Sequence, residues 1–160
     1  MKAASSDKEI NKHRRQYLTQ KEAGCLLVGM ILVVDDFVET LDVMRKLLRA
    51  KGYPCEVASN AQEALAFIRS HPPEQTLLVV LDCMMPGMSG IDVLKQIRSD
   101  PKIEHTSVVL FSAGFNQAYR DEALTLRALA WILKGTEQGF DEICRCYERI
   151  GGIASIKPTK

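Results

Sequence analysis

The chain has 160 residues, the length of one domain with room for a substantial hydrophobic core. Hydrophobic residues make up 46% of it and charged residues 26%, as is ordinary for a soluble globular protein. A formal net charge of +1 gives no whole-chain argument for binding nucleic acid or an anionic membrane. Five cysteines, an odd number without CxxC spacing, argue against a disulfide framework and against a zinc site, so we expect reduced thiols.

The N-terminal part of the chain differs from the rest in composition. Residues 1–22 carry six Lys or Arg and three Asp or Glu, with no sustained apolar period. The apolar run at 23–34 is too short to span a bilayer, and two aspartates follow it directly. We therefore expect a flexible tail at 1–29, one domain at 30–150, a short tail at 151–160, and a cytoplasmic protein without a membrane partner.

Short apolar runs predict five strands. Continuous runs of Val, Leu and Ile, without alternation, are typical of strands that are buried on both faces. The clearest run is 77–82, in which five apolar residues end in the carboxylate of Asp82 and a loop with one Pro and two Gly follows. We expect strands at 31–34, 53–58, 77–82, 107–111 and 130–133.

Helical spacing of apolar residues predicts a helix after each strand. The first helix ends at Gly52, and the second opens at Asn60, where Glu63 completes what resembles a capping box. The fourth helix has the weakest pattern. We expect helices at 37–51, 60–70, 90–99, 116–127 and 136–149. On the first of them, the side chains expected on the buried face are Val38, Leu41, Met44, Leu47 and Leu48.

Strict alternation of strands and helices predicts βαβ units with right-handed crossovers, and hence an α/β domain with a parallel sheet. The residues that end parallel strands lie at one edge of the sheet, where α/β proteins build their sites. These residues are Asp35 and Asp36 after the first strand, Asp82 after the third, Ser112 after the fourth and Lys134 after the fifth. In a doubly wound sheet the first and third strands are neighbours, so three carboxylates would share one crevice.

Carboxylates that share a crevice repel one another, and a hard divalent cation such as Mg²⁺ removes that cost. Lys134 would add a compact positive charge, and Ser112 a hydroxyl donor. The set lacks a histidine base, a paired nucleophile and a GxxxxGK[ST] loop, so the chemistry it favours is acceptance of a phosphoryl group by Asp82. Taken singly, each residue has a plainer explanation: Asp82 as a strand end, Asp36 as a helix cap, Ser112 in a turn, Lys134 in solvent.

Over residues 30–150 the chain resembles the receiver domain of two-component response regulators, the CheY-like family. The stretches that carry the resemblance are the strand and acidic pair at 31–36, the Asp-x-x-Met-Pro segment at 82–90, the pair Ser112-Ala113, and Lys134. Trp131, three residues before that lysine, falls where the family carries a switching aromatic residue.

The resemblance implies a flavodoxin-like (βα)5 fold with strand order 2-1-3-4-5. It implies that Asp82 is the phospho-acceptor, assisted by Lys134 and Ser112, and that Ser112 and Trp131 are switch residues. The Mg²⁺ ligands that it implies are the side chains of Asp36 and Asp82, the backbone carbonyl of Met84, and Asp35 mainly through water.

The resemblance also implies partners. The phosphoryl donor would be a histidine kinase or a phosphotransfer protein, and the output would pass to a downstream protein rather than to nucleic acid. The output surface would be the fourth helix, fifth strand and fifth helix. We therefore expect a stand-alone response regulator that is a monomer or a weak dimer through that surface.

Three residues depart from the family pattern: Gly135 where Pro is usual, Arg127 where a helix-ending Gly is usual, and Trp131 in place of a smaller aromatic. These departures keep a second hypothesis open, a pseudo-receiver that acts as a constitutive interaction module. A third hypothesis is an aspartyl-phosphate phosphatase. Such enzymes need a carboxylate two residues after the nucleophile, where this chain has Met84, so we expect no enzyme.

Overall fold

The computed structural model describes residues 29–71 and 75–151. Apart from Gly29 and Gly151, the two predicted tails therefore lie outside the described residues. In the described part, five strands form one parallel sheet in the order β2-β1-β3-β4-β5, which confirms the predicted fold and topology. The strands are β1 (Met30–Val34), β2 (Cys55–Ala58), β3 (Thr76–Asp82), β4 (Ser107–Ser112) and β5 (Ala130–Leu133).

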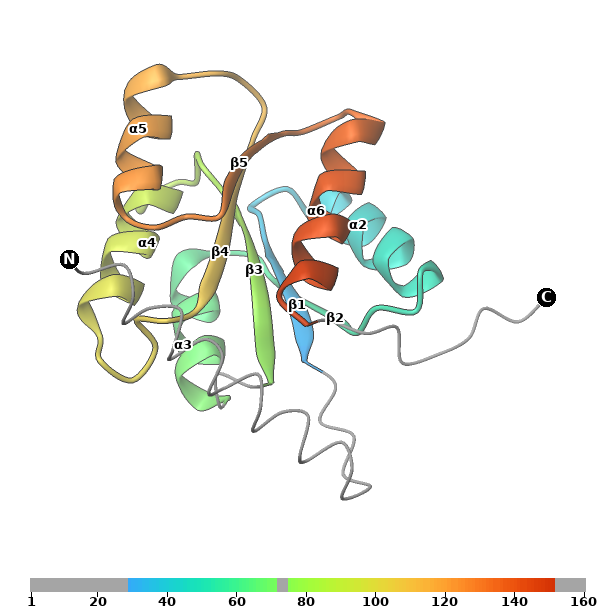
Figure 1. Ribbon diagram of the computed structural model, residues 1–160, viewed down its shortest axis with the longest axis horizontal. Helices are drawn as coiled ribbons and strands as arrows, with labels where there is room; N and C mark the ends of the chain where they lie inside the picture. Colours follow the sequence, from blue (N-terminus) through green and yellow to red (C-terminus); the bar gives the residue numbers. More distant parts are fainter. Residues whose placement is uncertain (1–28, 72–74, 152–160) are drawn as a thin grey trace.

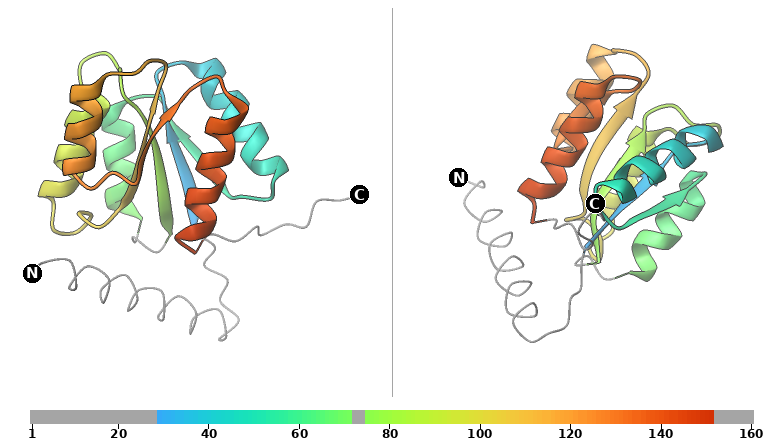
Figure 2. Two further views of the ribbon diagram at one scale, coloured as in Figure 1. Left: turned by 45° about the horizontal axis from the view of Figure 1, so that its top comes forward. Right: turned by 90° about the vertical axis from the view of Figure 1, so that its right-hand side faces the viewer.

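Helices cover both faces of the sheet, so the molecule has three layers (Figures 1 and 2). Two of them, α2 (Val38–Ala50) and α6 (Glu137–Arg149), lie on one face. The other face carries α3 (Ala61–Ser70), α4 (Gly90–Ser99) and α5 (Gln117–Thr125). These bounds agree with the predicted ones to within two residues at each end.

Side chains of the central strands alternate between two cores, one on each face of the sheet. On β1, Leu32 and Val34 pack with residues of α3 and α4, whereas Ile31 and Val33 pack with residues of α2 and α6. All four are at most 1% exposed. Burial on both faces explains why the strands read as unbroken apolar runs, and each such side chain contributes about 1.5–3 kcal/mol to folding.

Four of the described helices begin at a residue whose side chain accepts a hydrogen bond from a backbone N–H three positions later. These residues are Asn60, Ser89, Asn116 and Thr136. Ser89 forms a complete capping box with Asp92. The capping box predicted at Asn60 is different, because the carboxylate of Glu63 accepts hydrogen bonds from the backbone N–H and the hydroxyl of Ser59 instead.

Helix α2 begins differently and buries less than its spacing predicts. Its N-cap is Phe37, which makes no side-chain capping hydrogen bond. The expectation that Val38 and Leu47 are buried was wrong, since they are 59% and 44% exposed. Only the stripe that faces the sheet is covered, and its buried residues are Leu41, Met44 and Leu48.

The described cysteines are all buried and carry free thiols; they are Cys55, Cys83, Cys144 and Cys146. Burial raises the pKa of Cys55 and of Cys83 to about 11, so both are protonated at neutral pH. None of the helices in the described ranges has the length and apolar character needed to cross a membrane.

Candidate functional site

Three carboxylates meet at the carboxyl edge of the sheet, where β1 and β3 are paired. Asp82 is the last residue of β3, and Asp35 and Asp36 follow the end of β1. Each offers an oxygen, and the three oxygens lie within 4.8 Å of one another. Asp35 is fully buried, Asp82 is 5% exposed and Asp36 is half-buried. The three carboxylates predicted from the strand ends therefore lie together in the fold.

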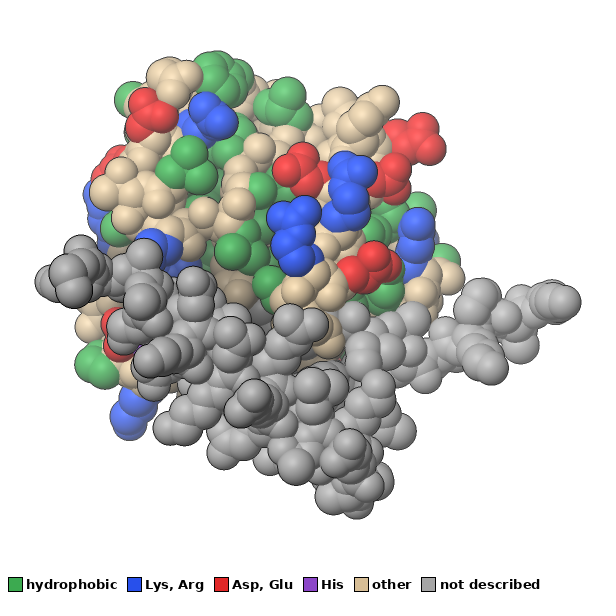
Figure 3. Space-filling model, in the orientation of Figure 1, with side chains coloured by type: hydrophobic (Ala, Val, Ile, Leu, Met, Phe, Trp, Pro, Cys, Tyr) green, Lys and Arg blue, Asp and Glu red, His purple; other side chains and the backbone are tan. Residues whose placement is uncertain are grey.

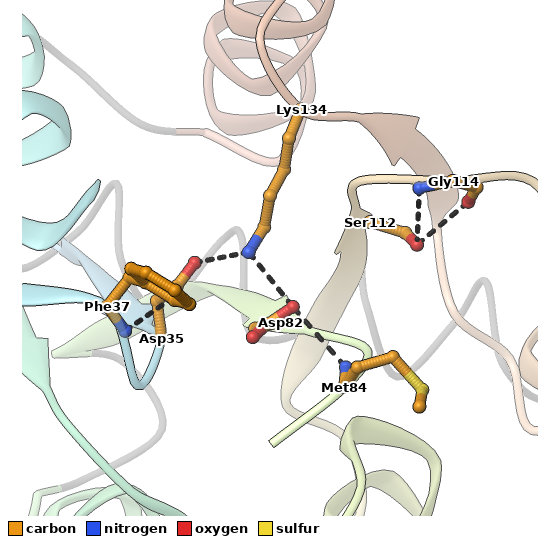
Figure 4. A network of polar contacts seen from close by, with 7 residues as sticks. All are labelled: Asp35, Phe37, Asp82, Met84, Ser112, Gly114 and Lys134. Carbon is orange, nitrogen blue, oxygen red and sulfur yellow. Dashed lines mark hydrogen bonds and ion pairs between the residues drawn. The ribbon is translucent and has the colours of Figure 1, made fainter. Parts of the chain in front are cut away.

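Lys134, the residue after β5, joins two of these carboxylates. Its Nζ lies 2.5 Å from Oδ2 of Asp35 and 3.0 Å from Oδ1 of Asp82, as Figure 4 shows. Burial raises the pKa of Asp82, and Lys134 opposes that shift. Burial alone would lower the pKa of Lys134, but its hydrogen bonds to Asp35 and Asp82 raise the pKa overall. Lys134 is thus a half-buried cation paired within the site and not a fully solvated surface side chain.

Backbone groups of the loops fix both buried carboxylates. The N–H of Phe37 donates to Oδ1 of Asp35 at 2.9 Å, and the N–H of Met84 donates to Oδ1 of Asp82 at 3.3 Å. Asp35 is thus the carboxylate that accepts a backbone hydrogen bond at the start of α2. The plainer explanation of Asp36 as the helix cap was wrong, since the N-cap is Phe37.

The two oxygens of Asp82 differ in their surroundings. Oδ1 accepts hydrogen bonds from both Lys134 and Met84, whereas Oδ2 has no hydrogen-bond donor among the described residues (Figure 4). One oxygen therefore orients the carboxylate, and the other keeps its lone pairs free.

The position of Asp82 also depends on Gly90, the first residue of α4. A Cβ at this position would overlap with the backbone carbonyl oxygen of Asp82 and lie 3.0 Å from the Cα of Cys83. The N–H of Gly90 donates to the carbonyl of Cys83 at 2.9 Å. Only glycine lets α4 begin this close to the end of β3.

Neither of the predicted switch residues, Ser112 at the end of β4 and Trp131 on β5, has a hydrogen bond to the carboxylates among the described residues. The hydroxyl of Ser112 donates to the carbonyl of Gly114 at 2.8 Å and accepts from its N–H, so it is held within its own loop (Figure 4). Trp131 is half-buried and packs against the core shared with α3 and α4. Its buried Nε1–H has no acceptor among the residues that the structure describes.

The donor set fits a hard divalent cation. Three carboxylates supply oxygen ligands without nitrogen or sulfur, and Mg²⁺ takes one or two carboxylates and keeps several waters. A cation would also offset the repulsion between Asp35, Asp36 and Asp82, which Lys134 only partly neutralises.

Comparison with known proteins identifies the family. The family model named response regulator receiver domain matches residues 31–143. The chain belongs to this family. Phosphorylation and Mg²⁺ binding in an acidic pocket are typical of receiver domains, which are signalling modules of two-component systems.

Relatives include chemotaxis protein CheY-3 of Vibrio cholerae, 33% identical over 105 residues, or 65% of this chain and 78% of CheY-3. Response regulator PleD of Caulobacter vibrioides is 33% identical over 104 residues, 65% of this chain, but the match spans only 22% of PleD. A solved receiver domain from Clostridium thermocellum superposes with a TM-score of 0.69 at 22% identity, covering 77% of this chain and 94% of that one. The structural likeness at this identity shows the receiver fold.

The structure adds two residues that the sequence pattern did not identify as part of this receiver site. Phe37 acts through its backbone N–H, and Gly90 through the side chain that it lacks. Met84, expected to act through its carbonyl, also contributes its backbone N–H to Asp82. The one available signal was Gly90 itself, a glycine at the start of a predicted helix, where glycine is a poor helix former.

Proposed function

We propose that Asp82 accepts a phosphoryl group and that the chain works as a phosphorylation-dependent switch. The observation that supports this most strongly is the arrangement of the Asp82 carboxylate. Lys134 and the backbone of Met84 orient it through Oδ1, and Oδ2, which has no donor in the part of the chain that the structure describes, lies beside two further carboxylates. A free, oriented carboxylate oxygen is what attack on phosphorus requires.

In the proposed reaction Oδ2 of Asp82 forms a bond to phosphorus, and the bond from phosphorus to the donor breaks with its electron pair leaving on the donor. The ammonium of Lys134, already 3.0 Å from Oδ1, neutralises charge on the incoming phosphoryl oxygens. Asp36, Asp82 and the carbonyl of Met84 would hold Mg²⁺, with Asp35 acting mainly through water. When bound, the ion would neutralise phosphoryl charge as well.

The proposed donor is a histidine kinase or a phosphotransfer protein. Support comes from the surface beside the site, where Phe37 is 64% exposed and Val38 is 59% exposed. Both follow Asp36 in the chain, so a partner that docks on the start of α2 would reach Asp82. Apolar side chains exposed next to a charged crevice are typical of a docking surface.

The proposed output is a change in protein contacts on the face formed by α5, β5 and α6. Hydrophobic side chains are visible over α5 and β5 in Figure 3, and Leu124, Leu129 and Leu133 are each more than 40% exposed. Helix α5 buries only Ala123, so it is held more weakly than the other helices and can shift. We propose a monomer or weak dimer through this face, a cytoplasmic location, and no role in nucleic-acid binding.

We propose no enzymatic turnover of a separate substrate. The position two residues after Asp82 holds Met84, whose side chain is 63% exposed and has no group that gains or loses a proton. The second candidate function is a constitutive interaction module. One observation favours it: the hydroxyl of Ser112 already has a donor and an acceptor within its own loop and does not face Asp82.

The test is incubation with acetyl phosphate and Mg²⁺, followed by intact mass. We expect one added phosphoryl group that is stable in acid and labile to base and hydroxylamine, as acyl phosphates are. Asp82→Asn should remove it, while Asp42→Asn, which changes an exposed carboxylate on α2, should not. An unlabelled parent protein would favour the constitutive module, and equal labelling of Asp82→Asn would exclude Asp82 as the acceptor.

A further inference from the structure

The connection from β5 to α6, which carries Lys134, contains only three residues, 134–136. The backbone N–H of Lys134 donates to the carbonyl of Ser112 at 2.8 Å, so the connection starts at a fixed place on the sheet edge. Thr136 ends it by capping α6, since its Oγ1 accepts from the N–H of Gly139 at 3.0 Å. The backbone of Lys134 is therefore held from both sides.

Two glycines make this short connection possible. Gly135 has φ +74°, in the left-handed region that side chains with a Cβ rarely adopt. Gly139 lies in the first turn of α6, and a Cβ there would overlap with the carbonyl oxygen of Leu133. The same Cβ would lie 2.9 Å from Oγ1 of Thr136 and 3.2 Å from Cγ2 of Ile132. Neither Leu133 nor Ile132 can yield easily, because the first contact is with backbone and Ile132 is 1% exposed.

We propose that Gly135 and Gly139 are positioning residues for Lys134, an inference that rests on the proposed function of the site. Gly135 provides the turn, and Gly139 lets the first turn of α6 lie against the end of β5. Together they set the point from which the lysine side chain reaches Asp35 and Asp82 at 2.5 and 3.0 Å. A Cβ at position 139 must push α6 away from Leu133 and carry Lys134 with it.

Displacing Lys134 has opposite effects on two properties of the site. The ammonium binds the same carboxylates that would hold Mg²⁺, so moving it away reduces like-charge repulsion and tightens Mg²⁺ binding. Phosphoryl acceptance becomes slower, because Lys134 no longer neutralises the incoming charge. General loss of structure would instead weaken both Mg²⁺ binding and phosphoryl acceptance. Opposite changes in these two properties therefore distinguish a displaced Lys134 from a misfolded protein.

The experiment compares the parent, Gly139→Ala and Gln138→Ala. Gln138 is the exposed neighbour in the same helical turn, so its variant controls for a change in helix propensity. Mg²⁺ affinity is measured by calorimetry, and the labelling rate by intact mass with acetyl phosphate at saturating Mg²⁺. We expect Gly139→Ala to tighten Mg²⁺ binding about threefold and to slow labelling about tenfold, with Gln138→Ala like the parent. The proposal would be overturned if Gly139→Ala left both Mg²⁺ affinity and labelling rate unchanged, or if it lowered both.

A double-mutant cycle with Lys134→Gln tests whether the effect passes through the lysine. In that background Gly139→Ala should no longer alter Mg²⁺ affinity, whereas additive effects would contradict the proposal. If Gly139→Ala does not fold, Gly135→Ala replaces it, since a Cβ there meets nothing within 4 Å and acts through backbone conformation alone. A parent protein that binds Mg²⁺ but never labels would refute the proposed function, while the Mg²⁺ cycle would still test the positioning.

Discussion

The guanidinium of Arg98, near the end of α4, donates a hydrogen bond of 3.2 Å to the carbonyl of Arg127, in the turn after α5. It also donates to the carbonyls of Leu126, Glu104 and Thr106. Burial, and then the charge of Arg127, lower the pKa of Arg98 to about 10, so it stays protonated at neutral pH. The C-terminal end of α5 is thus anchored to α4.

Replacing Arg127 by Gly should raise the free energy of unfolding by about 0.5–1 kcal/mol. Arg127 has φ +61° and is the non-glycine residue with positive φ in the described ranges, at the position where helices favour glycine. Its carbonyl remains available to Arg98 after the change. Urea denaturation measures the effect, with Arg120→Gly on the exposed face of α5 as control. The free energy of unfolding of the control should fall by about 1 kcal/mol. A fall in both variants would contradict the expected strain at Arg127.

Replacing Asp36 by Ala should raise the melting temperature of the metal-free protein. The change removes one of three mutually repelling carboxylates without removing a helix cap, because the N-cap of α2 is Phe37. Added Mg²⁺ should then stabilise the parent more than the variant, since the variant lacks a ligand. Thermal melting with and without Mg²⁺ measures both effects. A variant that melts lower without metal would show that Asp36 has a structural role that outweighs the repulsion.

Phosphorylation should change hydrogen exchange most across residues 112–135. The physical reason is that Ser112 must leave Gly114 to reach a phosphoryl group on Asp82, and α5 buries only Ala123. Exchange measured by mass spectrometry should change little across 61–70, which carries four buried side chains. Ser112→Ala should still label at Asp82 but show a smaller exchange change. If the phosphorylated and unphosphorylated proteins showed equal hydrogen exchange in residues 112–135, the constitutive module would be favoured.

The contribution of Glu63 to stability should depend on pH. Hydrogen bonds from the backbone N–H and hydroxyl of Ser59 lower the pKa of Glu63 below its ordinary 4.5. Its folded-state pKa is thus below the unfolded one, so the contribution is present above pH 4.5 and is lost as the pH falls through the lowered pKa. Glu63→Gln should therefore be less stable than the parent at pH 7, and the difference should shrink as the pH falls below 4.5. A difference that grows on acidification would contradict this sign.

Much of the fold could be predicted because its signals are local. Runs such as 31–34 and 78–81 are apolar throughout because both faces of the sheet are covered. Helix ends are marked by Gly52, which adopts a φ of +80°, and by Asn60, whose side chain caps α3. Prediction failed at Val38 and Leu47, where helical spacing alone cannot show how wide a stripe the sheet covers.

The sequence by itself determined the order of strands and helices, the family, and the residue types at the sheet edge: Asp35, Asp36, Asp82, Ser112 and Lys134. Only the tertiary structure decided that Oδ1 of Asp82 is held while Oδ2 has no donor within residues 29–71 and 75–151, that Ser112 bonds to Gly114, and that Gly139 must lack a Cβ. Residue patterns specify which face a side chain occupies, but these contacts depend on the exact positions of the loop and helix backbones, which packing of the whole core fixes.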